Sequence, residues 1–219
     1  MNKKIIVLDI ICYAAIPYLI WTHGREPLGD YIALLLSTMP GIIYTIYRFI
    51  NERHFNIAGL FILGSLLIST SVNLVSASAE SMLWNQVYLG FGFALIYFIS
   101  IVIKKPLVLY FAVDFAYLQG HKREHSKALF NVKSLFKWFQ LLTIVFVLRG
   151  VFQSLFKAWL LQTHGVDGYS QMLIWLNFSG YVFTGIIFGG YLFVTVKINH
   201  YLQGHNQKED LERQGKTSI

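Results

Sequence analysis

The chain has 219 residues, of which 55% are hydrophobic and only 13% are charged, and its formal net charge is +7. A soluble domain carries about 25% charged residues, so this composition excludes an ordinary soluble protein. The positive charge does not indicate nucleic-acid binding either, because the basic residues lie beside apolar stretches and not on a separate domain. We therefore expect no nucleic-acid partner and a chain whose main partner is the lipid bilayer.

Six apolar stretches are each long enough to cross a bilayer. A hydrocarbon core of about 30 Å needs about 20 residues of helix. This predicts an all-α polytopic membrane bundle of six transmembrane helices, forming one domain over residues 1–200. Residues 201–219 form a cytoplasmic tail that we expect to be frayed. The expected spans cover residues 5–21, 31–50, 57–76, 84–103, 138–161 and 171–196.

The basic residues are sorted to one set of connections. On the opposite set the sequence places only Arg25. Since Lys and Arg collect in cytoplasmic loops, this bias predicts that both termini are cytoplasmic. The cations of the cytoplasmic set are Lys3, Lys4, Arg48, Arg53, Lys104, Lys105, Lys122, Arg123, Lys127, Lys133, Lys137, Lys197, Lys208, Arg213 and Lys216.

The connections on the two sides differ in length. On the outer side Gly24, Pro27 and Gly29 mark a turn after the first span. On the inner side Pro106 disfavours helix in the residue before it, which predicts the end of the fourth span. Residues 107–119 are apolar but too short to cross, so we predict a short cytoplasmic helix at the interface. The expected outer connections are 22–30, 77–83 and 162–170, and the large inner one is 104–137.

Arg149 most needs an explanation, because it lies near the middle of the fifth expected span. A cation there costs at least about 2.5–3.5 kcal/mol on insertion scales. Gln153 and Lys157 follow at i+4 and i+8, so the three form one polar stripe. Lys157 is close enough to the outer boundary to extend its ammonium to the headgroups. Arg149 itself has three interpretations: a structural tie to carbonyls and to Asn or Ser side chains, a water-lined cavity or anionic ligand, or a misplaced span.

The acids available to Arg149 are few. Asp9 lies in the first span and Asp114 in the short apolar stretch of the inner connection. Neither is expected at the depth of Arg149, so a direct pair needs a tilted or kinked neighbour. Pro17 and Pro40 are the residues that can supply such a kink.

Two amides on other spans complete the expected ligand site. Asn73 follows Ser65 and Ser69 at a spacing of four on the third span, and Asn177 lies on the sixth. Small hydroxyl residues mark close helix packing more often than a conduit, but an Asn amide needs several hydrogen-bond partners. The candidate ligand-binding residues are Arg149, Gln153, Lys157, Asn73 and Asn177.

A basic cluster flanks the predicted interfacial helix. Each cation near anionic lipid contributes about 1 kcal/mol, so the cluster suits phospholipid head groups. Ordinary orientation control explains the same residues. The candidate head-group residues are Lys104, Lys105, Lys122, Arg123 and Lys127.

The sequence offers no catalytic machinery. It contains no nucleophile motif, phosphate loop or paired carboxylate, so we expect no enzyme and no cofactor. Cys12 is the single cysteine, and the seven histidines form no i, i+4 pair with a carboxylate inside a span. We therefore expect no metal site and no disulfide.

Several short motifs resemble a known group of proteins. They are Met39-Pro40, Arg48, the run from Asn51 to Asn56, Lys105-Pro106-Leu107, and Leu142-Thr143 followed by Arg149. Together they cover residues 31–160 and resemble small, poorly characterised bacterial inner-membrane proteins distantly similar to intracellular septation protein A. The resemblance implies a multi-pass protein of the bacterial inner membrane and a loose link to envelope maintenance and division, without an assigned reaction.

Two functions fit these observations. The first is non-enzymatic carriage or binding of a small anionic or lipidic ligand in a cavity that contains Arg149. The alternative is a membrane scaffold that recruits cell-envelope or division partners through its basic cytoplasmic face.

Overall fold

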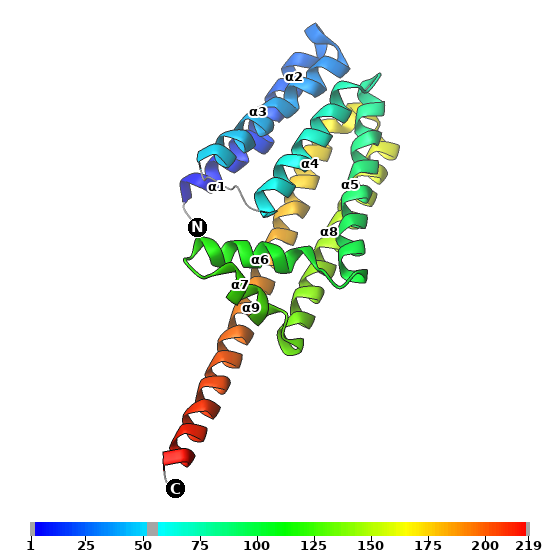
Figure 1. Cartoon of the computed structure of the whole chain (residues 1–219). Coiled ribbons are helices and arrows are strands. Elements are labelled where there is room, and N and C mark those ends of the chain that lie inside the picture. The colour runs from blue at the N-terminus through cyan, green and yellow to red at the C-terminus, as the bar shows by residue number, and fades with distance from the viewer. Residues whose placement is uncertain (1–2, 52–56, 218–219) are drawn as a thin grey trace.

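The computed structural model describes residues 3–51 and 57–217, and the side chains within 7–51 and 57–204. Six of its helices are long and apolar enough to cross a membrane. The protein is therefore an all-α, multi-pass membrane protein, as its composition predicts (Figure 1). The six spans are Val7–Leu28, Asp30–Asn51, Ile57–Leu74, Ala79–Val102, Lys133–His164 and Val166–Gly204.

The helices run in the order α1 (Lys3–Ile10), the π-helix η1 (Ile11–Ala15), α2 (Ile16–Leu28), α3 (Asp30–Asn51), α4 (Ile57–Leu74), α5 (Ala79–Val102), α6 (Leu107–Leu118), α7 (Arg123–Phe130), α8 (Lys133–His164), the 3-10 turn η2 (Val166–Gly168) and α9 (Tyr169–Thr217). We call the end of the bundle that carries α6 and α7 the basic end. The opposite end, with the α2–α3, α4–α5 and α8–α9 connections, is the far end. Arg53 lies outside the described residues, as do the side chains of Lys3, Lys4, Lys208, Arg213 and Lys216.

The far-end connections are shorter than expected. Gly24 and Pro27 continue α2, and Gly29 alone separates it from α3 with a positive φ of 77° that suits glycine. Ser78 and Ser81 form a capping box, which starts α5 at Ala79, several residues before the expected 84.

The basic end contains more helix than expected. α5 ends at Val102 and Pro106 precedes α6, which confirms the break and the short helix. The hydrophilic run after α6 forms the additional helix α7. α9 does not fray after its span, since the helix continues to Thr217 and extends well beyond α6 and α7 (Figure 1).

The first span contains a π-helical turn just before Pro17. Proline has no backbone N–H and cannot complete the ordinary ladder, and the N–H of Ile16 bonds back to the carbonyl of Ile11, five residues earlier. Pro40, the other residue expected to kink a span, lies inside the continuous helix α3.

Two buried clusters hold the bundle together. At the far end α2, α3, α5, α8 and α9 pack around Trp21, whose ring meets that of Tyr169 edge to face at 5.0 Å. At the basic end α6, α7, α8 and α9 pack around Phe139, which is fully buried. The middle of the bundle lies between these two clusters.

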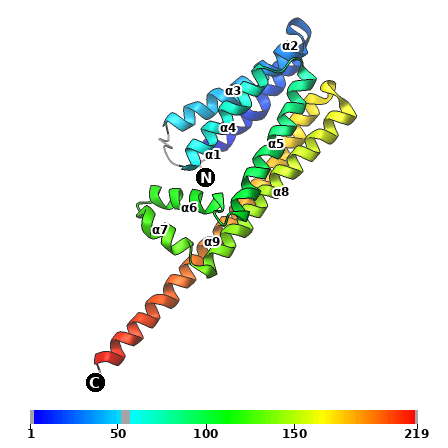
Figure 2. The ribbon, with the colours of Figure 1, turned by 45° about the vertical axis from the view of Figure 1, so that its right-hand side comes forward.

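α5 and α8 run side by side in opposite directions (Figure 2). Small residues allow this close approach: a Cβ added at Gly150 would lie 2.9 Å from the Cβ of Ala94. Likewise, a Cβ at Gly90 would overlap Oγ of Ser154. The hairpin of the first two spans, together with α4, lies on the other side of the bundle axis in Figure 2.

Candidate ligand cavity

A cavity of about 620 Å³ lies between the two buried clusters. This volume is in the range of ordinary small-molecule sites. Each of the six spans contributes at least one lining residue, so the cavity is central to the bundle. Its lining comprises Tyr13, Thr45, Phe61, Ile62, Ser65, Leu66, Ser69, Gln86, Gly90, Phe93, Ala94, Tyr97, Phe146, Arg149, Gly150, Gln153, Ser154, Lys157 and Leu176.

The antiparallel register of α5 and α8 gives the cavity two unlike ends. Toward the far end, Lys157 of α8 meets Gln86 of α5. Toward the basic end, the Tyr97 ring of α5 packs on Phe146 of α8 at 5.2 Å and on Phe61 of α4 at 5.5 Å. The far-end side of the cavity is therefore polar, and an aromatic layer closes the side toward the basic end.

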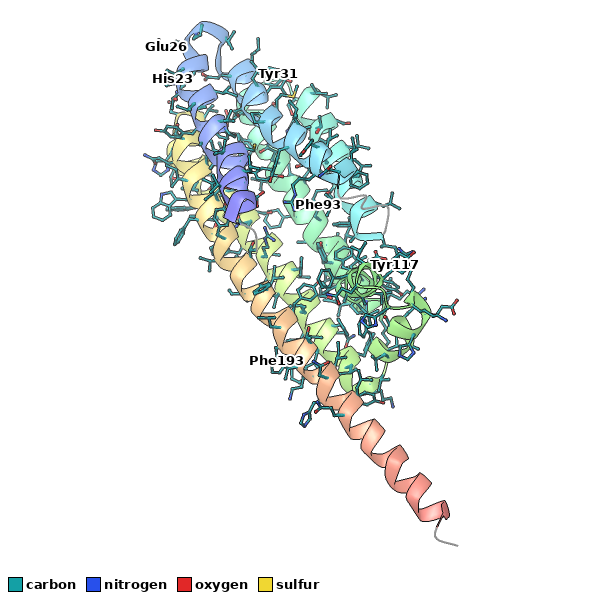
Figure 3. All side chains as sticks on the ribbon, turned by 90° about the vertical axis from the view of Figure 1, so that its left-hand side faces the viewer. His23, Glu26, Tyr31, Phe93, Tyr117 and Phe193 are labelled. Atoms are coloured by element: carbon teal, nitrogen blue, oxygen red, sulfur yellow. The ribbon has the colours of Figure 1, made fainter. Side chains whose placement is uncertain are left out.

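The aromatic layer also reaches the crosswise helix α6. The ring of Phe111 of α6 lies 5.7 Å from the Phe61 ring, and the ring of Phe93 of α5 lies 6.3 Å from it. Phe93 is labelled midway along the bundle in Figure 3, between His23 at the far end and Tyr117 of α6. These rings thus separate the cavity from the basic end.

Arg149 lines the cavity just above this aromatic layer. Its guanidinium makes no hydrogen bond and no ion pair with any residue that the structure describes, and the side chain is half-buried. A buried guanidinium has five N–H donors to satisfy. The cavity is the space from which those donors can be reached.

Neither candidate acid reaches Arg149. Asp9 lies 3.6 Å from Nη1 of Arg48, on the neighbouring helix α3. Asp114 is buried and engaged in two contacts: its Oδ1 lies 3.3 Å from Nη2 of Arg123, and its Oδ2 accepts from the N–H of Ala58 at 3.0 Å. Asp114 is thus fully engaged by other groups, whereas Asp9 is paired with Arg48 while its buried Oδ1 makes no hydrogen bond with the described residues.

Gln153 has the structural role that was one interpretation of Arg149, because its amide ties two helices together. Its Nε2 donates to Oγ of Ser179 at 3.0 Å and to the carbonyl of Leu176 at 3.4 Å. Both acceptors are on α9, so the amide ties α8 to α9 at the cavity wall.

Lys157 does not extend to the far surface, which corrects that expectation. Its Nζ donates to Oε1 of Gln86, and the Nε2 of the same amide donates to Oδ1 of Asn73 at 3.0 Å. The physical reason is the direction of α8. Helical side chains lean toward the N-terminus of their helix, which for α8 is the basic end, so Lys157 leans into the cavity.

The two asparagines are not cavity residues. Asn73 is buried behind the cavity wall. It accepts a hydrogen bond from Gln86 and so orients that amide toward Lys157. Asn177 donates to the carbonyl of Leu173 at 2.8 Å and to that of Tyr13 at 3.4 Å. The second carbonyl is four residues before Pro17 and therefore lacks its usual helical donor.

Sequence reasoning missed several wall residues. Gln86 is the most important, since it fixes the position of Lys157. Tyr13 and Thr45 join the wall from the first two spans through a hydrogen bond of 2.7 Å between their hydroxyls. The polar residues of the fourth span were the available signal for Gln86, but nothing in the sequence indicates which helix faces which.

The candidate head-group residues fall into two groups. Lys104 and Lys105 are exposed at the start of α6, whereas Lys122, Arg123 and Lys127 lie beyond its other end. α6 has 12 residues and is about 18 Å long, so the groups are well separated. Arg123 pairs with Asp114 and stacks over the Tyr117 ring at 4.5 Å.

The chemistry of the cavity is that of an anion site. Arg149 and Lys157 supply two cations, Gln86 and Gln153 supply amides, and no acidic residue is among the described residues of the lining. Within residues 7–51 and 57–204, whose side chains the structure describes, no group of three His, Cys, Asp or Glu side chains is placed to hold a metal ion.

Comparison with known proteins adds no family to this description. No family model, no curated protein and no solved structure matches the chain. The resemblance of residues 31–160 to relatives of intracellular septation protein A therefore stays a prediction.

Proposed function

We propose that this protein binds or carries a small anionic or lipidic ligand in its central cavity and performs no chemistry on it. The observation that supports this most is the state of Arg149. It lies in a cavity near the middle of α8, and it has no hydrogen-bond or ion-pair partner among the described residues. An unpaired cation in such surroundings is costly, and a bound anion removes that cost.

The distribution of basic residues between the two ends supports an orientation and a cellular location. We infer that the basic end faces the cytoplasm and that the membrane is the bacterial inner membrane. Exposed cations surround that end, while the far end has Arg25 neutralised by Asp30 at 2.6 Å and by Asp167. This is the distribution that the positive-inside rule favours.

The basic end also supports a second, lipid-related role. Phe115, Tyr117 and Leu118 of α6 are exposed beside the cations Lys122 and Lys127. Aromatic side chains on α6 beside cations at the start of α7 and within it suit the headgroup region of an anionic leaflet. We assign this surface to phospholipid contact, and recruitment of envelope partners stays the alternative for the same surface.

The cavity assignment is tested by anion-dependent stability. The purified protein in phosphatidylcholine nanodiscs is heated with heptanoate, suberate, inorganic phosphate or dodecyl phosphate, and with dodecyltrimethylammonium as the ligand of opposite charge. A ligand at about 100 times its dissociation constant stabilises the folded state by about 2.7 kcal/mol. We expect at least one anion to raise the unfolding temperature and the ammonium amphiphile to have no effect.

Variants locate the effect. Arg149→Leu should abolish the anion-dependent rise, whereas Lys137→Gln should keep it. Lys137 is a matched control because it is an exposed cation on the same helix, outside the cavity. The assignment is wrong if no anion stabilises the wild-type protein, or if Arg149→Leu responds as the wild type does.

A further inference from the structure

The cavity contains two cations at a fixed separation. Arg149 and Lys157 are both on α8 and differ by 157 − 149 = 8 positions. Eight residues of helix rise about 12 Å and turn about 80° beyond two full turns, so both side chains lie on one broad stripe of α8. Both side chains lean toward the helix N-terminus, so the axial separation of the two charged groups stays about the same.

Both cations keep donors for a ligand. The Arg149 guanidinium has no hydrogen bond or ion pair with the described residues, and the Lys157 ammonium uses one of its three N–H groups on Gln86. Asn73 holds that amide in place, so the ammonium is positioned on the wall before any ligand arrives. A single compact anion can satisfy one of the two cations and leaves the other unpaired.

Packed side chains lie at both ends of the space between the cations. Toward the basic end, Phe146 and Tyr97 form the aromatic layer below Arg149. Toward the far end, the next turns of α5 and α8 carry Met82, Leu83 and Leu160, which are buried in the far-end cluster. The length available to a ligand is therefore limited.

The wall between the cations mixes apolar and hydrogen-bonding groups. α4 presents Leu66 between Ser65 and Ser69, and α8 presents Gln153 and Ser154. Such a wall suits a short spacer and not a long lipid tail.

We propose that the cavity takes an elongated ligand with two anionic groups, carboxylates or phosphates, one bound by Arg149 and the other by Lys157. This proposal rests on the proposed anion-binding function and narrows its ligand class. With charge-assisted contacts of about 2.8 Å at each end of a 12 Å separation, the facing anionic oxygens lie roughly 6 Å apart.

The test compares dianions of graded length with a monoanion. Binding of glutarate, adipate, suberate and sebacate to the protein in phosphatidylcholine nanodiscs is measured by calorimetry, with heptanoate as the monoanion and inorganic phosphate as the compact anion. A hydrogen bond to a charged group is worth roughly a ten- to hundredfold change in affinity. We expect one intermediate dicarboxylate to bind at least tenfold more tightly than heptanoate, with shorter and longer diacids weaker.

Variants of Lys157 test whether this residue binds the second anionic group. Lys157→Gln keeps an amide donor for Gln86 but removes the charge, so it should bind the best diacid no more tightly than heptanoate. Lys157→Arg should restore the preference, and Lys137→Gln should not change it. Arg149→Leu should bind neither ligand.

Two results separate this proposal from the proposed function. If heptanoate binds as tightly as the best diacid, or Lys157→Gln keeps the preference, the two-anion ligand is wrong while Arg149-dependent anion binding still stands. If no anion binds, both fail.

A lipid arm identifies the source of the two anions. Nanodiscs containing cardiolipin, a lipid with two phosphates, are titrated with the best diacid. If cardiolipin abolishes the Lys157-dependent binding of the diacid, the site is assigned to a membrane ligand. If the diacid binds as it does without cardiolipin, the site is assigned to a water-soluble ligand. Either result agrees with a two-anion ligand, whereas cardiolipin competition that persists in Lys157→Gln contradicts it.

Discussion

Asp114 of α6 accepts a hydrogen bond at 3.0 Å from the backbone N–H of Ala58, in the first turn of α4. A carboxylate at this position interacts favourably with the positive end of the α4 dipole. The same carboxylate pairs with Arg123 of α7. One buried side chain thus joins the crosswise helices α6 and α7 to a membrane span.

The Asp114→Asn variant should be less stable than the wild type. It keeps an oxygen for the Ala58 N–H but removes the charge that faces Arg123 and the helix dipole, at a cost of about 1–3 kcal/mol. Thermal unfolding in detergent, followed by tryptophan fluorescence, measures the loss. The control is Glu124→Gln, which changes an exposed acid on α7 and should have the same unfolding temperature as the wild type. An unchanged unfolding temperature for Asp114→Asn would contradict the role of the contact.

Arg149→Leu should leave the ligand-free protein as stable as the wild type or more stable. An unpaired cation in a span costs at least about 2.5–3.5 kcal/mol, and an apolar side chain does not have that cost. Gln153→Leu, one turn away on the same face, should instead lose about 0.6–1.7 kcal/mol because it breaks the bond to Ser179.

The two variants are compared in one ligand-free thermal unfolding series. Opposite signs for the two changes are expected. A strong loss of stability in Arg149→Leu would show that Arg149 is a structural tie after all.

Gly150→Ala should destabilise the bundle, because its Cβ would lie 2.9 Å from the Cβ of Ala94 and 3.4 Å from the Cα. Relieving this overlap moves α5 away from α8, and overpacking of this kind costs about 1–3 kcal/mol. Gly92→Ala, on α5 itself, meets nothing within 4 Å and should be neutral or stabilising by up to about 1 kcal/mol. Unfolding temperatures of the two variants decide the point, and equal values would place the α5–α8 contact elsewhere.

The proposed orientation predicts which end a membrane-impermeant maleimide reaches. In a Cys12→Ser background, Glu80→Cys places a thiol at the far end and Lys105→Cys places one at the basic end, both at exposed positions. In spheroplasts the first should be labelled directly and the second only after permeabilisation. The reverse pattern would show that the basic end faces outward.

The spans and the polar stripe on the fifth could be predicted from the sequence for a simple reason. Both depend on local quantities, namely apolar length and the helical period. Arg149, Gln153 and Lys157 share a face because of their spacing alone, and the structure places all three on the cavity wall. The six spans follow in the same way from runs of apolar residues.

The wall opposite that stripe could not be predicted. Helices that are apolar all round do not encode which side meets a neighbour, so the facing of Gln86 toward Lys157 depends on packing between distant segments. The contacts of Asn73 could not be predicted either. Its spacing on α4 places it near the cavity, but its amide accepts a hydrogen bond from Gln86 and does not line the cavity. The connection expected at residues 22–30 is also mostly helical, since Gly24 and Pro27 are compatible with a helix that ends at Leu28.

The π turn at Ile11–Ala15 sets the angular phase of everything before it in the first span. Such a turn holds one residue more than the corresponding turn of an α-helix. Each residue of an α-helix advances by about 100°, so adding one residue between Asp9 and this turn would rotate Asp9 by about that angle around the helix axis. The carboxylate would then leave Arg48. A single-residue insertion in this apolar stretch would leave its hydropathy almost unchanged, yet it would separate the paired charges of the first two spans. The exact count of residues there is a constraint that composition alone does not reveal.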